Sequence, residues 1–104
     1  MNRGHGLVKT ANLKARGGPT LICGPSEHRV ALLFSPPQGE AVYTVSTDPG
    51  VVLGAGFNLQ AQSGPLSITR EHGDATTRAW YGAASVDMTV GYLETIDPAA
   101  AEPR

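Results

Sequence analysis

The sequence predicts an all-β protein: an antiparallel β-sandwich, or a jelly-roll-like small barrel, of about seven to eight strands that follow an extended N-terminal arm. Three observations predict this class. Glycine (13) and proline (8) are frequent in a chain of 104 residues, which indicates many turns. Turn signals recur roughly every 8–12 residues, a spacing typical of short antiparallel strands. No segment shows the apolar period of a helix.

Residues 1–19 are the predicted arm, because they show neither a helical nor a strand period and end in a Gly-Gly-Pro breaker. The arm has a net charge of +4 and no acidic residue, whereas the rest of the chain carries four basic and nine acidic groups, a net charge of −5. Such a segment is either a plain loose terminus or an arm that becomes ordered against a partner. Its basic residues are Arg3, Lys9, Lys14 and Arg16.

The strand domain is expected to span residues 20–96. The first strand is residues 20–23 (TLIC), which Gly-Pro ends. Residues 28–34 (HRVALLF) are apolar on both faces and predict a central strand. Residues 40–47 (EAVYTVST) are rich in the residue types that favour strands, and the DPG turn at 48–50 follows them.

The middle of the domain predicts three further strands. Residues 51–56 (VVLGAG) indicate an apolar strand, or an edge piece with a bulge at its glycines. Residues 57–62 (FNLQAQ) alternate apolar and polar side chains, and residues 66–70 (LSITR) follow after a Ser-Gly-Pro turn. The predicted inner-face residues of these two runs are Phe57, Leu59, Ala61, Leu66 and Ile68.

The last part of the domain predicts two strands, residues 76–83 (TTRAWYGA) and residues 86–96 (VDMTVGYLETI). Period-two alternation in the second run places one set of apolar side chains on its inner face, namely Val86, Met88, Val90 and Tyr92. Residues 97–104 (DPAAAEPR) are expected to form a flexible tail.

The polar stretch REHGD, residues 70–74, raises the question of an active site or a metal loop. Glu71, His72 and Asp74 would be the acid–base groups or ligands. Because neighbouring residues of a turn point in different directions, and because no second cluster of such residues exists, we expect a solvated turn instead. Gly73 would supply its positive φ, and Asp74 would act as a cap.

No other motif indicates catalysis, a cofactor or a metal site. The chain has no phosphate-binding glycine loop and no nucleophile elbow. The single cysteine, Cys23, excludes an intramolecular disulfide and a Cys-based zinc site, and is expected to be a small buried residue. Neither a membrane span nor a secretion signal is visible, so we expect a soluble protein made in a reducing cytoplasm.

Trp80 and Tyr81 are adjacent on a predicted strand, so one ring is expected to point into the core and the other outward. An outward ring favours an interface or a patch that contacts a partner. The acidic balance of the strand domain disfavours binding to nucleic acid.

The order of these runs resembles a layout found in small virion proteins of tailed bacteriophages, over about 70 of the 104 residues. The family's R-x-A-L-L-I strand is matched by residues 29–34, its V-Y-V strand by 42–45 and its L-x-L/I strand by 66–68. An H-G-D…A-W-Y-A segment is matched by 72–82, and a last strand ending V-x-E by 90–94. The long basic arm and the Pro-Pro pair that follows residue 35 depart from this pattern and leave open which virion site is occupied.

The resemblance implies a β-sandwich that decorates or cements a phage capsid, or forms part of a head or tail appendage. The expected function is therefore a virion structural protein without enzymatic activity, made in the host cytoplasm. Its implied partners are the major capsid protein and further copies of itself around a local symmetry axis, for example as a trimer, with neither membrane nor nucleic acid. The expected contact residues are Arg3, Lys9, Lys14, Arg16, Trp80 and Tyr81.

Two alternatives belong to other classes. A carbohydrate-binding or receptor-binding module of a phage fibre or baseplate would use Trp80, Tyr81 or Tyr43 as an exposed stacking platform. A small hydrolase would need convergent polar groups, of which Glu71 and His72 are the candidates.

Overall fold

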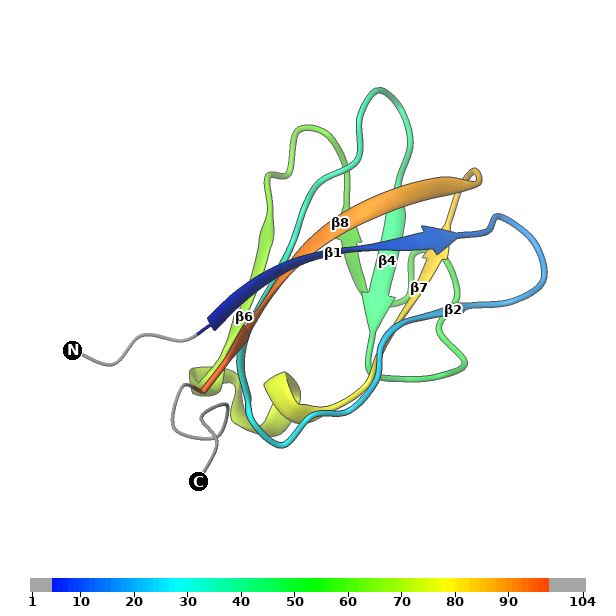
Figure 1. Ribbon diagram of the computed structural model, residues 1–104. Coiled ribbons are helices and arrows are strands. Elements are labelled where there is room, and N and C mark those ends of the chain that lie inside the picture. Colours follow the sequence, from blue (N-terminus) through cyan, green and yellow to red (C-terminus); the bar gives the residue numbers. More distant parts are fainter. Residues whose placement is uncertain (1–4, 98–104) are drawn as a thin grey trace.

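The computed structural model describes residues 5–97, which form a sandwich of two four-stranded antiparallel sheets (Figure 1). Sheet A has the order β1-β8-β3-β6, and sheet B has the order β2-β7-β4-β5. A 3₁₀ segment, η1 (Arg70–Thr77), joins β6 to β7. In the described part of the chain, no helix has the length and apolar character needed to cross a membrane. The strands are β1 (His5–Leu13), β2 (Thr20–Cys23), β3 (Arg29–Phe34), β4 (Tyr43–Ser46), β5 (Phe57–Leu59), β6 (Leu66–Thr69), β7 (Trp80–Ala84) and β8 (Met88–Ile96).

The predicted fold class is confirmed as a sandwich of eight strands, and the two sheets do not close into a barrel. The central position predicted for residues 28–34 is also confirmed, because β3 lies between β8 and β6. Its alternation places Leu32 and Phe34 inside, where both are fully buried. Continuous apolar character thus identified an inner strand correctly.

The N-terminal segment differs from the expected arm. Residues 5–13 form strand β1, which pairs with β8 along its whole length without a register shift (Figure 1). The inward positions of β1 include Lys9, Ala11 and Leu13, and the lysine interrupts the apolar alternation that would have revealed a strand. Arg3 and residues 98–104 of the predicted tail lie outside the described residues.

Residues 51–56 do not form the predicted strand. Val51 is buried, and the segment folds back so that the Gly54 N–H donates to Thr44 Oγ1 at 2.8 Å. The bend leaves β5 only three residues long, and in it Leu59 alone is buried while Phe57 is 55% exposed. The inward positions predicted for Ala61 and Val86 are wrong, because both residues lie in exposed connections beyond the strand ends. Phe57 does take the predicted inner face, opposite buried Val45 and with its ring 6.5 Å from that of Trp80, but it lies on the edge strand of sheet B and stays largely exposed.

The core lies between the sheets and contains a cluster of aromatic rings. The ring of Phe34 lies 5.6 Å from that of Trp80 and 6.2 Å from that of Tyr92, measured between centroids. Each polar ring atom has a partner: Trp80 Nε1 donates to the Ala75 carbonyl at 2.8 Å, and the Tyr92 hydroxyl donates to the Ile22 carbonyl at 3.1 Å. These bonds let large rings fill the core without unsatisfied polar groups.

A substitution at Gly56 tests how closely the bent segment packs on sheet B. A Cβ at this position would lie 2.7 Å from the Val45 carbonyl oxygen and 2.9 Å from Thr44 Cγ2. Because the nearest atom belongs to backbone, Gly56→Ala is expected to destabilise the fold by about 1–3 kcal/mol in urea unfolding. Gly24→Ala, where a Cβ meets no atom within 4 Å, is the control and should change stability by less than about 0.5 kcal/mol. If the two variants had equal midpoints of urea unfolding, the close packing of Gly56 on β4 would be contradicted.

Candidate interaction surfaces

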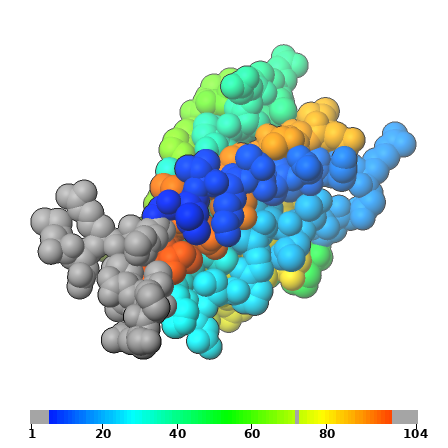
Figure 2. Space-filling view, viewed as in Figure 1, coloured from blue at the N-terminus to red at the C-terminus, as the bar shows by residue number. Residues whose placement is uncertain are grey.

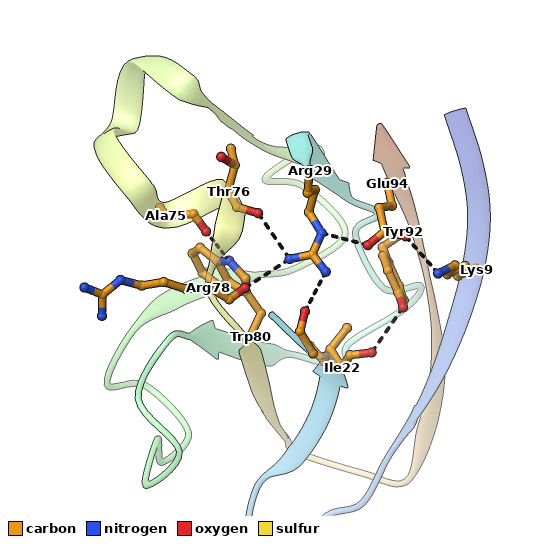
Figure 3. Close-up of polar contacts among 10 residues, drawn as sticks. Lys9, Ile22, Arg29, Ala75, Thr76, Arg78, Trp80, Tyr92 and Glu94 are labelled. Atoms are coloured by element: carbon orange, nitrogen blue, oxygen red, sulfur yellow. Dashed lines mark hydrogen bonds and ion pairs between the residues drawn. The ribbon is translucent and has the colours of Figure 1, made fainter. Parts of the chain in front are cut away.

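A buried network of charged side chains joins β1, β3 and β8 (Figure 3). Arg29, on β3, is 2% exposed, and its Nε donates to Glu94 Oε2 at 2.7 Å. The other carboxylate oxygen of Glu94 lies 2.8 Å from Lys9 Nζ, and the lysine remains half-exposed at the edge. One carboxylate therefore faces two cations, one of them fully enclosed.

The remaining bonds of Arg29 reach backbone carbonyls of two other segments. Nη1 donates to the carbonyls of Thr76 at 3.1 Å and Arg78 at 3.0 Å, at the end of η1. Nη2 donates to the Gly24 carbonyl at 2.6 Å, just after β2. Figure 3 shows the guanidinium between the carbonyls of Thr76 and Arg78 on one side and Glu94 on the other. The planar fork of arginine fits several acceptors at once, so this side chain ties together parts of the chain that are far apart in sequence.

The electrostatics of the network keep its groups charged. Burial alone would raise the pKa of Glu94, but hydrogen bonds from Lys9 and Arg29 outweigh burial and hold that pKa below its usual value. The hydrogen bond to Glu94 raises the pKa of Lys9. Because general acid–base catalysis needs a pKa near the working pH, these shifts favour a structural ion pair over proton transfer.

Arg29 and Glu94 are not among the residues that the sequence predicted for a site. A signal was present, because period-two alternation that places Tyr92 inside also places Glu94 inside. Arg29 opens an apolar central strand in the same way. Two opposite charges at inward positions of neighbouring strands indicate a buried ion pair, but the register that joins them is visible only in the structure.

The stretch REHGD begins the 3₁₀ segment η1, which continues to Thr77. Gly73 has a φ of 76°, as predicted for the turn. The Asp74 carboxylate does not serve as the expected cap. It accepts hydrogen bonds from Arg78, which lower the pKa of Asp74, and both side chains are exposed. Within residues 5–97, no group of three or more His, Cys, Asp or Glu could hold a metal ion.

Trp80 and Tyr81 alternate as predicted. Trp80 is 2% exposed and belongs to the core, so its ring is not available as the expected contact residue. Tyr81 is half-buried on the outer side of sheet B, where it stands opposite Leu21. Tyr43 is fully buried, so two of the three rings considered for a stacking platform are covered. Cys23 is buried, as predicted, and burial raises the pKa of its thiol.

An apolar groove of about 360 Å³ lies between sheet B and the connection from β1 to β2. The Ala15 N–H donates to Asp87 Oδ1 at 2.8 Å and fixes that connection, which also carries exposed Arg16. The predicted basic contact residues are therefore separated: Lys14 lines the groove, whereas Lys9 is bound to Glu94. Residues that line the groove include Lys14, Gly18, Pro19, Val52, Leu53 and Ala83.

The outward side of sheet A, here called the open face, carries no ionisable side chain on its described strands. Cross-strand pairing aligns the face in rows. One row consists of Val8, Leu93, Leu33 and Ser67. A second row consists of Gly6, Thr95, Ala31 and Thr69. Towards the other end of the strands, the face continues with Thr10 opposite Gly91 and Asn12 opposite Thr89.

Charged groups stand at the two ends of the open face rather than on it. The Arg70–Asp97 ion pair, with 3.6 Å between Nη2 and Oδ2, lies beyond the ends of β6 and β8. Lys14 and Asp87 lie just past the opposite ends of β1 and β8. An uncharged centre with a polar rim is the usual composition of a protein–protein interface.

Comparison with protein-family models, with curated proteins and with solved structures found no match for this chain. What the chain itself offers are its fold and the composition of its surfaces. Among these surfaces, the open face is distinguished by side chains that point away from the core and include no ionisable group on the described strands.

Proposed function

We propose that this chain is a non-enzymatic structural protein of a phage virion, a capsid decoration or cement protein that binds the major capsid shell through the open face of sheet A. The observation that carries this proposal is the absence of ionisable side chains from the described strands of that face, in a chain of which 16% is charged. The sequence resemblance to small virion proteins of tailed phages supports the choice of partner.

A four-stranded sheet is a suitable surface for this role because it is rigid and its side chains are fixed in rows. Val8 is 82% exposed at one end of the central row, and Leu33 and Leu93 are half-buried within it. Covering such side chains releases water from apolar surface, and no charge has to be desolvated. A preorganised surface also loses little conformational entropy on binding.

The basic connection between β1 and β2 supplies a second contact in this proposal. Lys14 and Arg16 are exposed there, beside the end of the open face. Cations at the rim of an interface raise the association rate with an acidic surface and make it sensitive to salt. Tyr81 and the apolar groove lie on sheet B and remain candidates for contact with a neighbouring subunit.

Binding to a shell is tested with a double variant, Ser67→Lys with Thr95→Lys, which places two ammonium groups beside the central row. Shells assembled from the major capsid protein of the same genome are sedimented with the purified protein. Because an unpaired charge is unfavourable inside an interface, the double variant is expected to bind at least about tenfold more weakly, equivalent to about 1.4 kcal/mol.

Gln62→Lys, in the exposed turn after β5, adds the same charge away from the open face and is expected to bind like the wild type. Thermal unfolding of all three proteins confirms that the fold is retained. Wild-type protein that fails to sediment with the shells would overturn the capsid proposal. Equal binding by the double variant would remove the open face from it.

A further inference from the structure

Strand β1 is the outermost strand of sheet A, and its backbone is hydrogen-bonded on one side only. The orientation of β8 shows which residues face the free side. Ser35 N–H donates to the Gly91 carbonyl, and Asp97 N–H donates to the His28 carbonyl, so the backbone N–H and C=O groups of the odd-numbered residues of β8 point toward β3. The backbone N–H and C=O groups of the even-numbered residues of β8 therefore point toward β1.

The register then fixes the orientation of β1. Even-numbered Tyr92 and Val90 stand opposite Lys9 and Ala11, so the odd-numbered residues of β1 bond to β8. The even-numbered residues turn both their N–H and their C=O groups to the free edge, where the described part of the chain places no strand. These residues are Gly6, Val8, Thr10 and Asn12, and all of them are exposed.

Of the features with which proteins usually prevent pairing between copies, this edge has one, an inward-pointing lysine, and it lacks proline and bulges. Residues 5–13 contain no proline, and the pairing with β8 shows no bulge. The one lysine of the strand, Lys9, points inward and is bound to Glu94 at 2.8 Å, so its charge is compensated within the subunit. In Figure 2, β1 (dark blue) lies on the surface beside β8 (orange).

We propose that β1 pairs antiparallel with β1 of a second copy of this chain, about a two-fold axis through Val8, so that both copies of sheet A form one continuous sheet. A second copy is the occupant that fits, because the even-numbered residues of one edge meet the even-numbered residues of the other. Val8 then stands opposite Val8 of the second copy, and Gly6 opposite its Thr10.

Charge and apolar exposure select this register. A pair centred on Lys9 would set two ammonium groups directly opposite each other, which is unfavourable. A strand pairing centred on Val8 places Lys9 opposite Leu7 of the second copy, where the methylene stem of the lysine covers the Leu7 side chain, which is 46% exposed. The same pairing places Val8 against Val8 of the second copy. The two large apolar side chains that β1 exposes, Leu7 and Val8, are then both covered.

The contact is isologous and closes after two copies, so it yields a dimer rather than the trimer considered from the sequence. In this dimer the two sheets A lie side by side, so their two open faces lie on the same side of the dimer. This inference concerns the free protein in solution and does not depend on binding to a capsid.

Sedimentation velocity across a concentration series tests the dimer. The wild type is expected to dimerise, and Val8→Pro to be monomeric, because proline removes a donor at the edge while the bonds to β8 come from odd-numbered residues. Val8→Thr is the matched control: it keeps the N–H and a β-branched side chain and should still dimerise. Val8→Lys, which opposes two ammonium groups, is a second dissociating variant if proline disturbs β1.

A wild type that stays monomeric up to about 1 mM, a concentration at which even a weak complex forms, would overturn the proposal. So would a Val8→Lys variant that dimerises as tightly as the wild type.

The register is tested by cysteine cross-linking. In a hydrogen-bonded antiparallel pair the opposite Cα atoms lie about 5.5 Å apart, within reach of a disulfide. Val8→Cys is therefore expected to give a covalent dimer on mild oxidation, and Thr10→Cys, which faces Gly6 of the second copy, is not. Wild-type protein controls for Cys23, which is buried. Cross-linking of Thr10→Cys at an equal or higher rate would contradict the Val8-centred pair.

Discussion

Replacing Arg29 by methionine is expected to lower the free energy of unfolding by about 3–5 kcal/mol, because it leaves the buried Glu94 carboxylate without its enclosed partner. The carbonyls of Gly24, Thr76 and Arg78 lose a donor at the same time. Methionine retains most of the apolar stem, so the loss reports the guanidinium rather than a cavity. Urea unfolding measures the change.

Two further variants show whether the loss of stability depends on the buried position of Arg29 and on the planar shape of its side chain. Arg78→Met removes an exposed arginine whose partner, Asp74, is also exposed, and it is expected to lower the free energy of unfolding far less than Arg29→Met does. Arg29→Lys keeps the charge but loses the planar fork, and its stability should lie between wild type and Arg29→Met. If Arg29→Met and Arg78→Met unfolded at the same urea concentration, the network would not have the structural role assigned to it.

The second large effect is expected from Glu94→Gln, which removes the carboxylate that faces both Arg29 and Lys9. It leaves the enclosed guanidinium without a counter-charge and is expected to destabilise the fold by about 3–5 kcal/mol at neutral pH. Glutamine has nearly the same size as glutamate, so packing changes little.

The same pair of proteins gives a test in acid. Because the folded-state pKa of Glu94 lies below the usual 4.5, the stability that its ionisation contributes is present above that value and is lost as the pH falls through the folded-state pKa. The difference in unfolding free energy between wild type and Glu94→Gln should therefore be largest near neutrality and narrow below about pH 4.5. A difference that stayed constant through this range would contradict the assignment.

The pKa of Asp74 is also lowered, by the hydrogen bond from Arg78, so Asp74 changes stability with pH in the same direction. Because Asp74 is present in both proteins, its contribution cancels from the difference between them and leaves the Glu94 effect.

The strands that sequence reasoning predicted correctly are those in which local pattern and burial agree. The apolar run of residues 29–34 lies in the middle of sheet A, and the turn glycine Gly73 adopts positive φ. Trp80 and Tyr81 alternate because period two follows from backbone geometry alone. These features depend on residues close together in the sequence, so they can be predicted from local patterns.

The features that could not be predicted depend on partners distant in sequence. Strand β1 was not recognised because Lys9 occupies an inward position that only Glu94, 85 residues later, makes acceptable. Residues 51–56 have the composition of a strand, but the Val51 and Ala55 N–H groups donate to carbonyls three residues earlier, and the Gly54 N–H donates to the side chain of Thr44. The open face likewise consists of ordinary alternating residues on four separate strands, and its lack of charge becomes visible only once the register is known.

The pairing of β1 with β8 joins the first and last strands of the described chain, with His5 opposite Ile96. Sheet A therefore cannot be completed during synthesis until the chain has left the ribosome through residue 96. Such non-local closure carries a large loop entropy, and folds of this kind reach the native state in milliseconds to seconds rather than microseconds. Until β8 has been synthesised, one edge of β3 in the nascent chain has no strand to pair with. The yield of folded protein is therefore expected to depend on how well the nascent chain is protected from aggregation during that time.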